Sequence, residues 1–262
     1  PDQPADPIIV HPDVRKMLLT ARAYAEGGRA LAMWTTLQID KELGTGDDAV
    51  RADCADLVAL ITPIVKAFLT DNAWIATSHC LQVFGGHGYI RETGAEQLVR
   101  DSRINMIYEG TNTIQALDLI GRKVLGDNGR KLKKFGKLVA EFVEQEGTNE
   151  AMQEFVNPLA DLGDKVTKLS TEIGMKAFAN ADEAGAAAVD YLRVCGPLVF
   201  ASFWARMARV ALDKQTSGDP FYTAKLHTAR FYFAKLLPET AGLIRSARAG
   251  AAPLMAMDEA LF

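Results

Sequence analysis

The sequence predicts an all-α protein whose helices pack as bundles. Over most of the 262 residues, apolar side chains recur at three- and four-residue spacing, which is the period of an amphipathic helix. No segment alternates apolar and polar residues over a useful strand length, and no repeat period is evident. Glycine-rich and aspartate-rich stretches separate the periodic segments, so we expect the helices to follow one another through turns.

The first predicted helix begins after Pro12 and ends near Gly44, where a glycine can cap it. Small residues in its apolar stripe would let another helix approach closely. The stripe consists of Val14, Met17, Leu18, Ala21, Ala25, Gly28, Leu31 and Ala32.

Asp47 or Asp48 is expected to cap the second helix at its N-terminus. This helix contains Pro63, which removes a backbone donor and should kink the helix or divide it in two. It is expected to stop at Gly85 and Gly86.

Thr111 or Thr113 should cap the next helix, which is followed by a turn over residues 125–129. From there a helix with basic and then acidic residues runs to about Gly147, and its charges indicate a solvated face.

Three further helical segments complete the chain. One carries a stripe from Leu159 to Ile173, and a long one runs from Asp182 to Lys214. A turn at residues 216–220 precedes a last aromatic-rich helix over residues 221–246. Of two candidate seams, 125–129 and 146–150, we choose the first, so residues 1–128 and 129–262 are the predicted domains.

Composition excludes several function classes. Hydrophobic residues make up 48% and charged residues 24% of the chain, with a net charge of −4. This balance is typical of a globular protein and indicates neither nucleic acid nor an anionic membrane as a partner. No run of about 18 consecutive apolar residues predicts a membrane span. No signal peptide pattern is evident either, and we expect a cytoplasmic location.

The three cysteines are Cys54, Cys80 and Cys195. Their odd number and their spacing favour reduced, buried thiols over disulfides or a metal site. The histidines have no companions at ligand spacing, so no metal site is predicted. The proline-rich start suggests that the chain is a piece of a longer protein.

Residues 82–115, "QVFGGHGYIRETGAEQLVRDSRINMIYEGTNTIQ", differ from the rest of the chain. Gly85, Gly86 and Gly88 can adopt left-handed backbone conformations or approach a phosphate closely. They can equally form a tight turn that ends a helix, and local physics favours the turn. His87 is more often a packing group in such a turn than a catalytic base. Arg100, Asp101 and Arg103 indicate an ion-pair network on a short helix.

Glu109 lies between Tyr108 and Gly110, directly before a predicted helix start. It could be a carboxylate that the helix N-terminus keeps ionised. It could instead be a desolvated general base. Local sequence leaves both roles open.

The joint pattern of this stretch strongly resembles the C-terminal helical domain of acyl-CoA dehydrogenases. The carrying motifs are Q-x-F-G-G-x-G-Y, R-D-x-R and Y-E-G-T-x-x-I-Q, and the resemblance covers roughly residues 65–125. The segment beyond residue 130 resembles the additional helical domain of the longer bacterial members, such as the group around 3-methylmercaptopropionyl-CoA dehydrogenase. The expected fold is therefore a four-helix-bundle domain followed by a second helical bundle.

The resemblance implies roles for individual residues. Glu109 matches the catalytic base that removes the α-proton of an acyl-CoA thioester, and its backbone N–H would hydrogen-bond the thioester carbonyl. Gly110 matches a substrate-lining position. Thr111 and Thr113 match contacts to FAD in the same subunit. Five further residues match the segment that contacts the FAD of a neighbouring subunit, namely Gln82, Val83, Phe84, Gly85 and Gly86.

The implied reaction is α,β-dehydrogenation of an acyl-CoA to a trans-2-enoyl-CoA in fatty acid metabolism. The implied partners are an electron-transfer flavoprotein and further copies of the chain, as a dimer or tetramer. The family's N-terminal helical domain and β-domain are absent from these residues, so we expect the isolated chain to be inactive. Two alternatives are an acyl-CoA oxidase and a non-catalytic helical interaction module.

Overall fold

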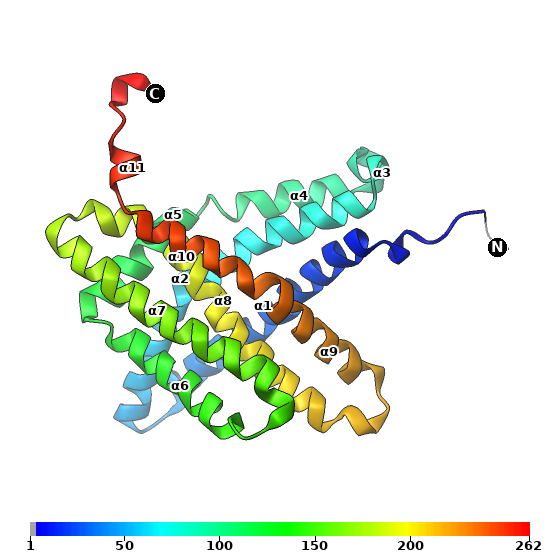
Figure 1. Ribbon diagram of the computed structural model, residues 1–262, viewed down its shortest axis with the longest axis horizontal. Helices are drawn as coiled ribbons and strands as arrows, with labels where there is room; N and C mark the ends of the chain where they lie inside the picture. Colours follow the sequence, from blue (N-terminus) through cyan, green and yellow to red (C-terminus); the bar gives the residue numbers. More distant parts are fainter. Residues whose placement is uncertain (1–3) are drawn as a thin grey trace.

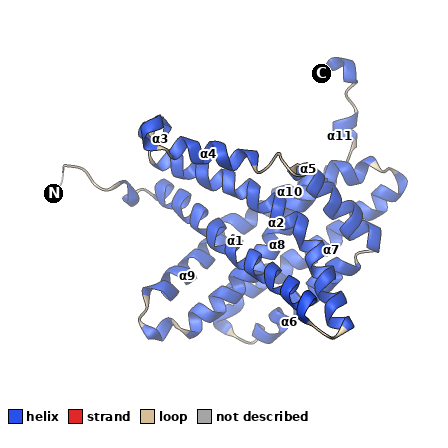
Figure 2. Cartoon of the chain, turned by 180° about the vertical axis from the view of Figure 1, so that it is seen from behind, coloured by secondary structure: helices blue, strands red, loops and turns tan. Residues whose placement is uncertain are grey.

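The computed structural model describes residues 4–262, and the first three residues of the predicted N-terminal domain lie outside it. Every regular element in this range is helical, as the sequence predicts (Figure 2). The long helices are α1 (Pro12–Gly44), α2 (Asp48–Val83), α4 (Ala95–Ile104), α6 (Arg130–Glu146), α7 (Gln153–Ala179), α8 (Asp182–Asp213), α9 (Pro220–Phe231) and α10 (Thr240–Ala249). The short helices are α3 (Gly86–Tyr89), α5 (Asn112–Leu117) and α11 (Ala252–Met255).

The helix boundaries follow the local signals. Pro12 begins α1, where a missing N–H has no cost, and the Asp47 carboxylate caps α2 by accepting from the N–H groups of Ala49 and Val50 at 2.8 and 3.2 Å. Thr111 caps α5. α2 runs through Pro63 as one helix, so the expected division there does not occur.

The buried face of α1 differs from the predicted stripe. Of that stripe only Leu31 is buried, and Leu18 is 37% exposed. The helix instead buries Thr20, Ala23, Gly27, Leu31, Thr35 and Gln38. Hydropathy missed this face because half of it is polar. The hydroxyls of Thr20 and Thr35 donate to main-chain carbonyls one turn back, both at 2.8 Å, which removes the cost of burying them.

Helix α8 lies at the centre of the molecule, packed against α1, α2, α5, α7, α9 and α10 (Figure 1). By length and composition alone, one window of α8 is apolar enough to cross a membrane, but 72% of that window is buried inside the bundle. A helix that is apolar on all sides is also what the core of a large helical protein requires.

One hydrophobic core extends across both predicted domains. Phe68 of α2 and Phe200 of α8 meet edge to face with ring centroids 4.8 Å apart. A Cβ at Gly27 of α1 would lie 2.8 Å from Trp204 Nε1, and a Cβ at Gly196 would collide with the Phe68 ring. These glycines allow α8 to approach α1 and α2 closely. Residues 129–262 (the second segment) therefore complete the hydrophobic core of residues 4–128 (the first segment).

The predicted last helix over residues 221–246 is not continuous. α9 ends at Phe231, a wide turn (η7, Tyr232–Leu236) and a tight turn (η8, Leu237–Glu239) follow, and only then does α10 begin. Pro238, within η8, has no N–H to donate to a helical ladder. The wide turn includes Tyr232, whose buried hydroxyl donates to the Pro197 carbonyl of α8 at 2.9 Å. The interruption therefore accommodates a specific contact with the central helix.

The cysteines agree only in part with the prediction. Cys54 and Cys195 are buried thiols, and burial raises the pKa of Cys195 to about 12. Cys80 is exposed, so the expectation of a buried thiol is wrong there. It lies near the end of α2, where the helix leaves the bundle.

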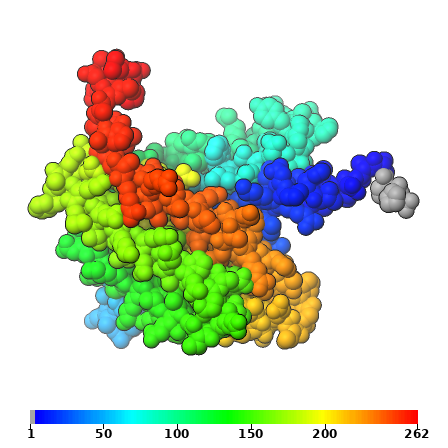
Figure 3. Space-filling model, viewed as in Figure 1, coloured from blue at the N-terminus to red at the C-terminus, as the bar shows by residue number. Residues whose placement is uncertain are grey.

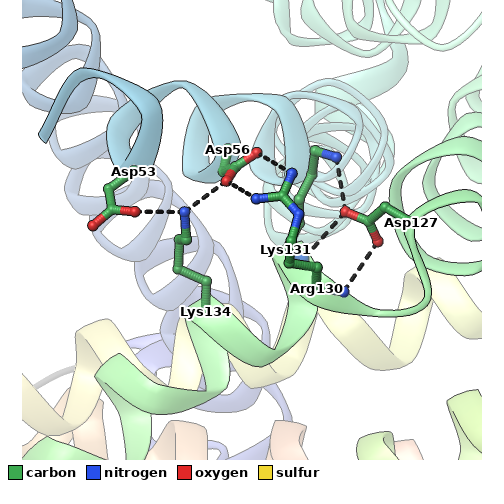
Figure 4. Close-up of polar contacts among 6 residues, drawn as sticks. All are labelled: Asp53, Asp56, Asp127, Arg130, Lys131 and Lys134. Carbon is green, nitrogen blue, oxygen red and sulfur yellow. Dashed lines mark hydrogen bonds and ion pairs between the residues drawn. The ribbon is translucent and has the colours of Figure 1, made fainter. Parts of the chain in front are cut away.

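An ion-pair cluster joins α2 to the beginning of α6 (Figure 4). Asp56 accepts from Arg130 Nη2 at 2.8 Å and from Lys134 Nζ at 2.6 Å, and Lys134 also reaches Asp53 at 2.6 Å. The hydrogen bond from Arg130 lowers the pKa of Asp56 from 3.8 to about 2. Asp127 accepts from the Arg130 N–H at 3.1 Å, so it caps the start of α6. The cluster spans the predicted domain seam, and the division at residue 128 stays a prediction.

Replacing Gly196 by alanine should destabilise the protein by about 1–3 kcal/mol, because the added methyl group collides with the Phe68 ring. Gly185→Ala is the matched control on the same helix. A Cβ at Gly185 meets no atom within 4 Å, so that variant should gain up to about 1 kcal/mol from helix propensity. Urea unfolding followed by circular dichroism measures both. Equal effects of the two variants would contradict the close packing of α8 on α2.

The Asp56 cluster should make stability depend on acid pH. Because the folded pKa of Asp56 is about 2 and its ordinary value is 3.8, the contribution is complete above about pH 4 and is lost as the pH falls towards 2. We expect the ion pairs of Asp56 to contribute about 1 kcal/mol to the free energy of unfolding, since Arg130 stays 57% exposed and solvent screens it. Asp56→Asn should flatten the profile of unfolding free energy between pH 5 and 2, whereas Asp53→Asn, 66% exposed, should change it less.

Candidate active site

The stretch with the unusual motifs forms an arm that projects from the bundle. The end of α2, α3 and α4 extend beside the beginning of α1, away from the helices of the second segment (Figures 1 and 3). Large apolar side chains are exposed along this arm. They include Phe84, Tyr89, Leu98, Ile104 and Tyr108, each at least half exposed. An apolar surface of this kind marks a contact region for another part of a protein or for a partner.

The tip of the arm carries the first group of predicted site residues. Gln82, Phe84, Gly85 and Gly86 are exposed and Val83 is half-buried. Gly85 has a φ of +61°, a conformation that favours glycine, and no atom lies within 4 Å of a Cβ built there. The glycines therefore form both the helix-ending turn and an open backbone surface.

Gly88 has a different role. It is buried, and a Cβ would lie 2.7 Å from the Leu81 carbonyl oxygen. The glycine is required because α3 packs on the last turn of α2. His87 is exposed, and its side chain makes no hydrogen bond within residues 4–262.

The expected ion-pair network on α4 is not formed in the described part of the chain. Asp101 accepts from Gln97 Nε2 at 2.7 Å, and neither Arg100 nor Arg103 forms a salt bridge with it. On a helix, positions one and two residues apart do not face each other, so Asp101 is poorly placed to pair with either arginine. Arg103 instead lines a pocket beside α2.

Glu109 occupies a turn of unusual backbone geometry between α4 and α5. Its φ is +52°, and the next residue, Gly110, has a φ of +84°. A left-handed conformation is uncommon for glutamate and costs roughly 1–2 kcal/mol. The carboxylate is exposed and makes no ion pair within residues 4–262, and the Glu109 N–H donates to no acceptor there. One residue thus presents an unused donor and an unused carboxylate.

The side chain of Asn112 fastens this turn to α2. It donates to Asp71 Oδ1 at 2.6 Å and to the Ala67 carbonyl at 3.2 Å, and it accepts from Lys66 Nζ at 2.8 Å. It is also within 3.0 Å of the Thr70 hydroxyl. The Asn112 N–H closes the turn by donating to the Met106 carbonyl at 3.1 Å. The position of Glu109 therefore depends on residues some 40 positions earlier in the sequence.

A pocket of about 460 Å³ opens beside this turn. Thr111 and Thr113 line it, and so do Arg103 of α4 and Arg193 of α8. Among the described residues, Asp71 is the one that places a carboxylate in its wall. Burial raises the pKa of Asp71, while the hydrogen bond from Asn112 and the charge of Arg193 oppose that effect. Cations and hydroxyls around one open pocket can bind an anionic or polyhydroxylated group.

The two groups of predicted residues do not meet within this chain. Gln82–Gly86 lie at one end of α4 and Glu109–Thr113 at the other, and ten helical residues span about 15 Å. The assigned role of each residue stays a prediction.

Sequence reasoning missed the residues that support the turn. Asn112 stands inside the recognised motif, but its partners Lys66 and Asp71 belong to an ordinary helical stretch, and Arg193 belongs to the second segment. No local pattern marks them.

Within residues 4–262 no cluster of three or more metal-ligating side chains occurs.

Two solved structures of acyl-CoA enzymes share this fold. An acyl-CoA dehydrogenase of Bacillus anthracis, complexed with FAD, superposes with a TM-score of 0.71 over 94% of this chain and 44% of its own, at 20% identity. Acyl-CoA oxidase3 of Yarrowia lipolytica reaches a TM-score of 0.69 over 95% of this chain and 39% of its own, at 18% identity. The fold is that of the C-terminal helical region of these acyl-CoA enzymes.

Sequence comparison gives the family. Residues 2–125 match the model "Acyl-CoA dehydrogenase, C-terminal domain", and residues 135–258 match "Acetyl-CoA dehydrogenase C-terminal like". The chain is 38% identical to 3-methylmercaptopropionyl-CoA dehydrogenase of Ruegeria pomeroyi over 90% of its length and 41% of the relative. It is 33% identical to the broad-specificity linear acyl-CoA dehydrogenase FadE5 of Mycobacterium tuberculosis over 96% of its length and 43% of the relative. The chain belongs to the acyl-CoA dehydrogenase family and spans less than half the length of these relatives.

The structural role of Gly88 can be separated from an open backbone role of Gly86. Gly88→Ala should loosen the tip of the arm, because the Cβ collides with the Leu81 carbonyl, and the cost should be about 1–3 kcal/mol. Gly86→Ala should leave the tip intact, since nothing lies within 4 Å of its Cβ. Amide hydrogen exchange of residues 81–90 measures the difference. Slow exchange in both variants would contradict this packing.

Proposed function

We propose that the protein containing this chain is a FAD-dependent acyl-CoA dehydrogenase with Glu109 as its catalytic base. The observation that carries the proposal is the Glu109 turn, where a left-handed residue presents an unused N–H and an exposed carboxylate together. Membership of the family and the names of the relatives support the reaction class.

The proposed proton transfer needs both groups of Glu109. The α-proton of a thioester is too weakly acidic for a carboxylate in water, so the carboxylate must be desolvated and the developing enolate stabilised. The carboxylate of Glu109 would take the α-proton, while its backbone N–H donates to the thioester carbonyl oxygen. Because the Glu109 side chain is exposed, an acyl-CoA can approach its carboxylate from the solvent side of the turn. Gly110 has no side chain to obstruct the substrate.

The residues present fit one wall of a flavin site. Thr111 and Thr113 offer hydroxyls to the 460 Å³ pocket, and Arg103 offers a guanidinium donor that suits a diphosphate. At the tip, Gln82–Gly86 present open backbone and an exposed phenyl ring. Bound FAD would supply the acceptor for the β-hydrogen, which leaves as hydride when the trans-2-enoyl-CoA forms.

The partners follow from the same proposal. The exposed apolar arm supports assembly with another subunit or domain, so we propose a homo-oligomer of at least two chains. An electron-transfer flavoprotein is the proposed electron acceptor, as the dehydrogenase reaction requires. Relatives from Ruegeria pomeroyi, Syntrophomonas wolfei and Mycobacterium tuberculosis each match nine-tenths of the chain or more, which supports a bacterial protein, and we propose a cytoplasmic location.

Glu109→Gln in the full-length enzyme should lower the rate of acyl-CoA dehydrogenation by roughly 10²–10⁴-fold, because the amide cannot accept the α-proton. Glu150→Gln, an exposed glutamate on the other segment, is the matched control and should keep full activity. Reduction of a dye acceptor by several acyl-CoA thioesters measures the rate. A normal rate in Glu109→Gln would refute the base assignment, and stoichiometric hydrogen peroxide release by the unmodified enzyme would indicate an oxidase.

A further inference from the structure

The turn that carries Glu109 holds a conformation that must be stabilised from outside. Glu109 and Gly110 are successive left-handed residues, and a Cβ at Gly110 would lie 2.8 Å from Gln115 Nε2. Strained backbone of this kind persists only where the surroundings determine it. The surroundings here are the Asn112 side chain and the residues of α2 that bind it.

The hydrogen-bonding groups of Asn112 are fully used. Its two amide hydrogens have three acceptors within hydrogen-bond distance, Asp71, Ala67 and Thr70, and its amide oxygen accepts from Lys66. An asparagine with donors and acceptor all engaged has one orientation, so it fixes the start of α5 against α2. Glu109 is three residues away, and the Asn112 main chain also closes its turn.

Residues 129–262 contribute to the surroundings of Asn112 through helix α8. Val189, Leu192 and Arg193 line the same pocket as Asn112 and Asp71, and α8 packs directly on α5. Arg193 forms no salt bridge in residues 4–262, and its charge acts on Asp71, as do the charges of Lys66 and Arg103. An ionised Asp71 is a stronger acceptor for the Asn112 amide than a neutral one. A cation in the same pocket wall as Asp71 therefore strengthens the hydrogen bond from Asn112 to Asp71.

We propose that Asn112 is a positioning residue for Glu109, and that Arg193 of α8 supports it as a cation in the wall of the pocket that Asp71 and Asn112 also line. This gives residues 129–262 a part in the reaction without any contact with the reacting atoms. The proposal deepens the proposed function and rests on Glu109 being the base. The hydrogen bonds by which the Asn112 side chain holds the turn against α2, called the Asn112 latch below, can be tested independently of that function.

The first experiment measures the latch in the full-length enzyme. Asn112→Ala should accelerate amide hydrogen exchange in peptides covering residues 104–116 by at least about tenfold, since the turn loses its side-chain anchor. Arg193→Met should accelerate it less, and Arg193→Lys should restore the original rate. Arg245→Met is the control, because Arg245 is an exposed arginine of α10 that does not line the pocket. Unchanged exchange in Asn112→Ala would overturn the latch.

The second experiment measures catalysis in the same variants. Asn112→Ala should lower kcat by roughly 10–100-fold with KM for the acyl-CoA within about threefold, because the base is misplaced while the substrate site is kept. The loss in Arg193→Met should be smaller and should be recovered by Arg193→Lys. Faster exchange with unchanged kcat would overturn the positioning role. If Arg193→Met behaved like Arg245→Met in both experiments, the proposed contribution of residues 129–262 to positioning Glu109 would be wrong.

The two proposals fail differently. If Glu109→Gln keeps a normal rate, the proposed function is wrong, whatever the exchange rates of the Asn112 variant are. If Glu109→Gln is inactive but Asn112→Ala matches the unmodified enzyme in kcat, only the positioning proposal is wrong.

Discussion

The close approach of α8 to α1 and α2 is the contact on which the rest of the structure depends. Gly27 and Gly196 lack the side chains that would keep these helices apart, and the rings of Phe68, Phe200 and Trp204 fill the space between them. Interiors packed at this density tolerate little displacement. The position of α8 therefore sets the position of α5, which lies against it, and with α5 the start of the Glu109 turn.

The same contact explains why the chain has one core although it matches two family models. Each segment buries part of its apolar surface on the other, and the ion pairs around Asp56 join them again at the beginning of α6. A bundle of α1, α2 and α5 alone would expose Phe68 and the neighbouring apolar face of α2. The two segments are thus distinct in sequence and interdependent in packing.

The arm shows the opposite balance. Its apolar side chains are exposed, and its two groups of recognised residues lie at opposite ends of α4. An apolar surface is stable in water only at a cost that burial removes. The arm is therefore the part of the chain best suited to contact another domain or subunit, which accords with a flavin site built from more than one chain.

The helical class, most helix boundaries and the motif around Glu109 could be predicted from local sequence. Caps such as Asp47 and Thr111 act on N–H groups two or three residues away, so local sequence contains the whole interaction. Packing in three dimensions sets which face of α1 is buried, why Cys80 is exposed, and how the last helical stretch is divided around Tyr232. It also joined Asn112 to Asp71 and brought Arg193 beside both. These outcomes depend on burial and on partners far apart in the chain, and hydrophobic periodicity measures neither.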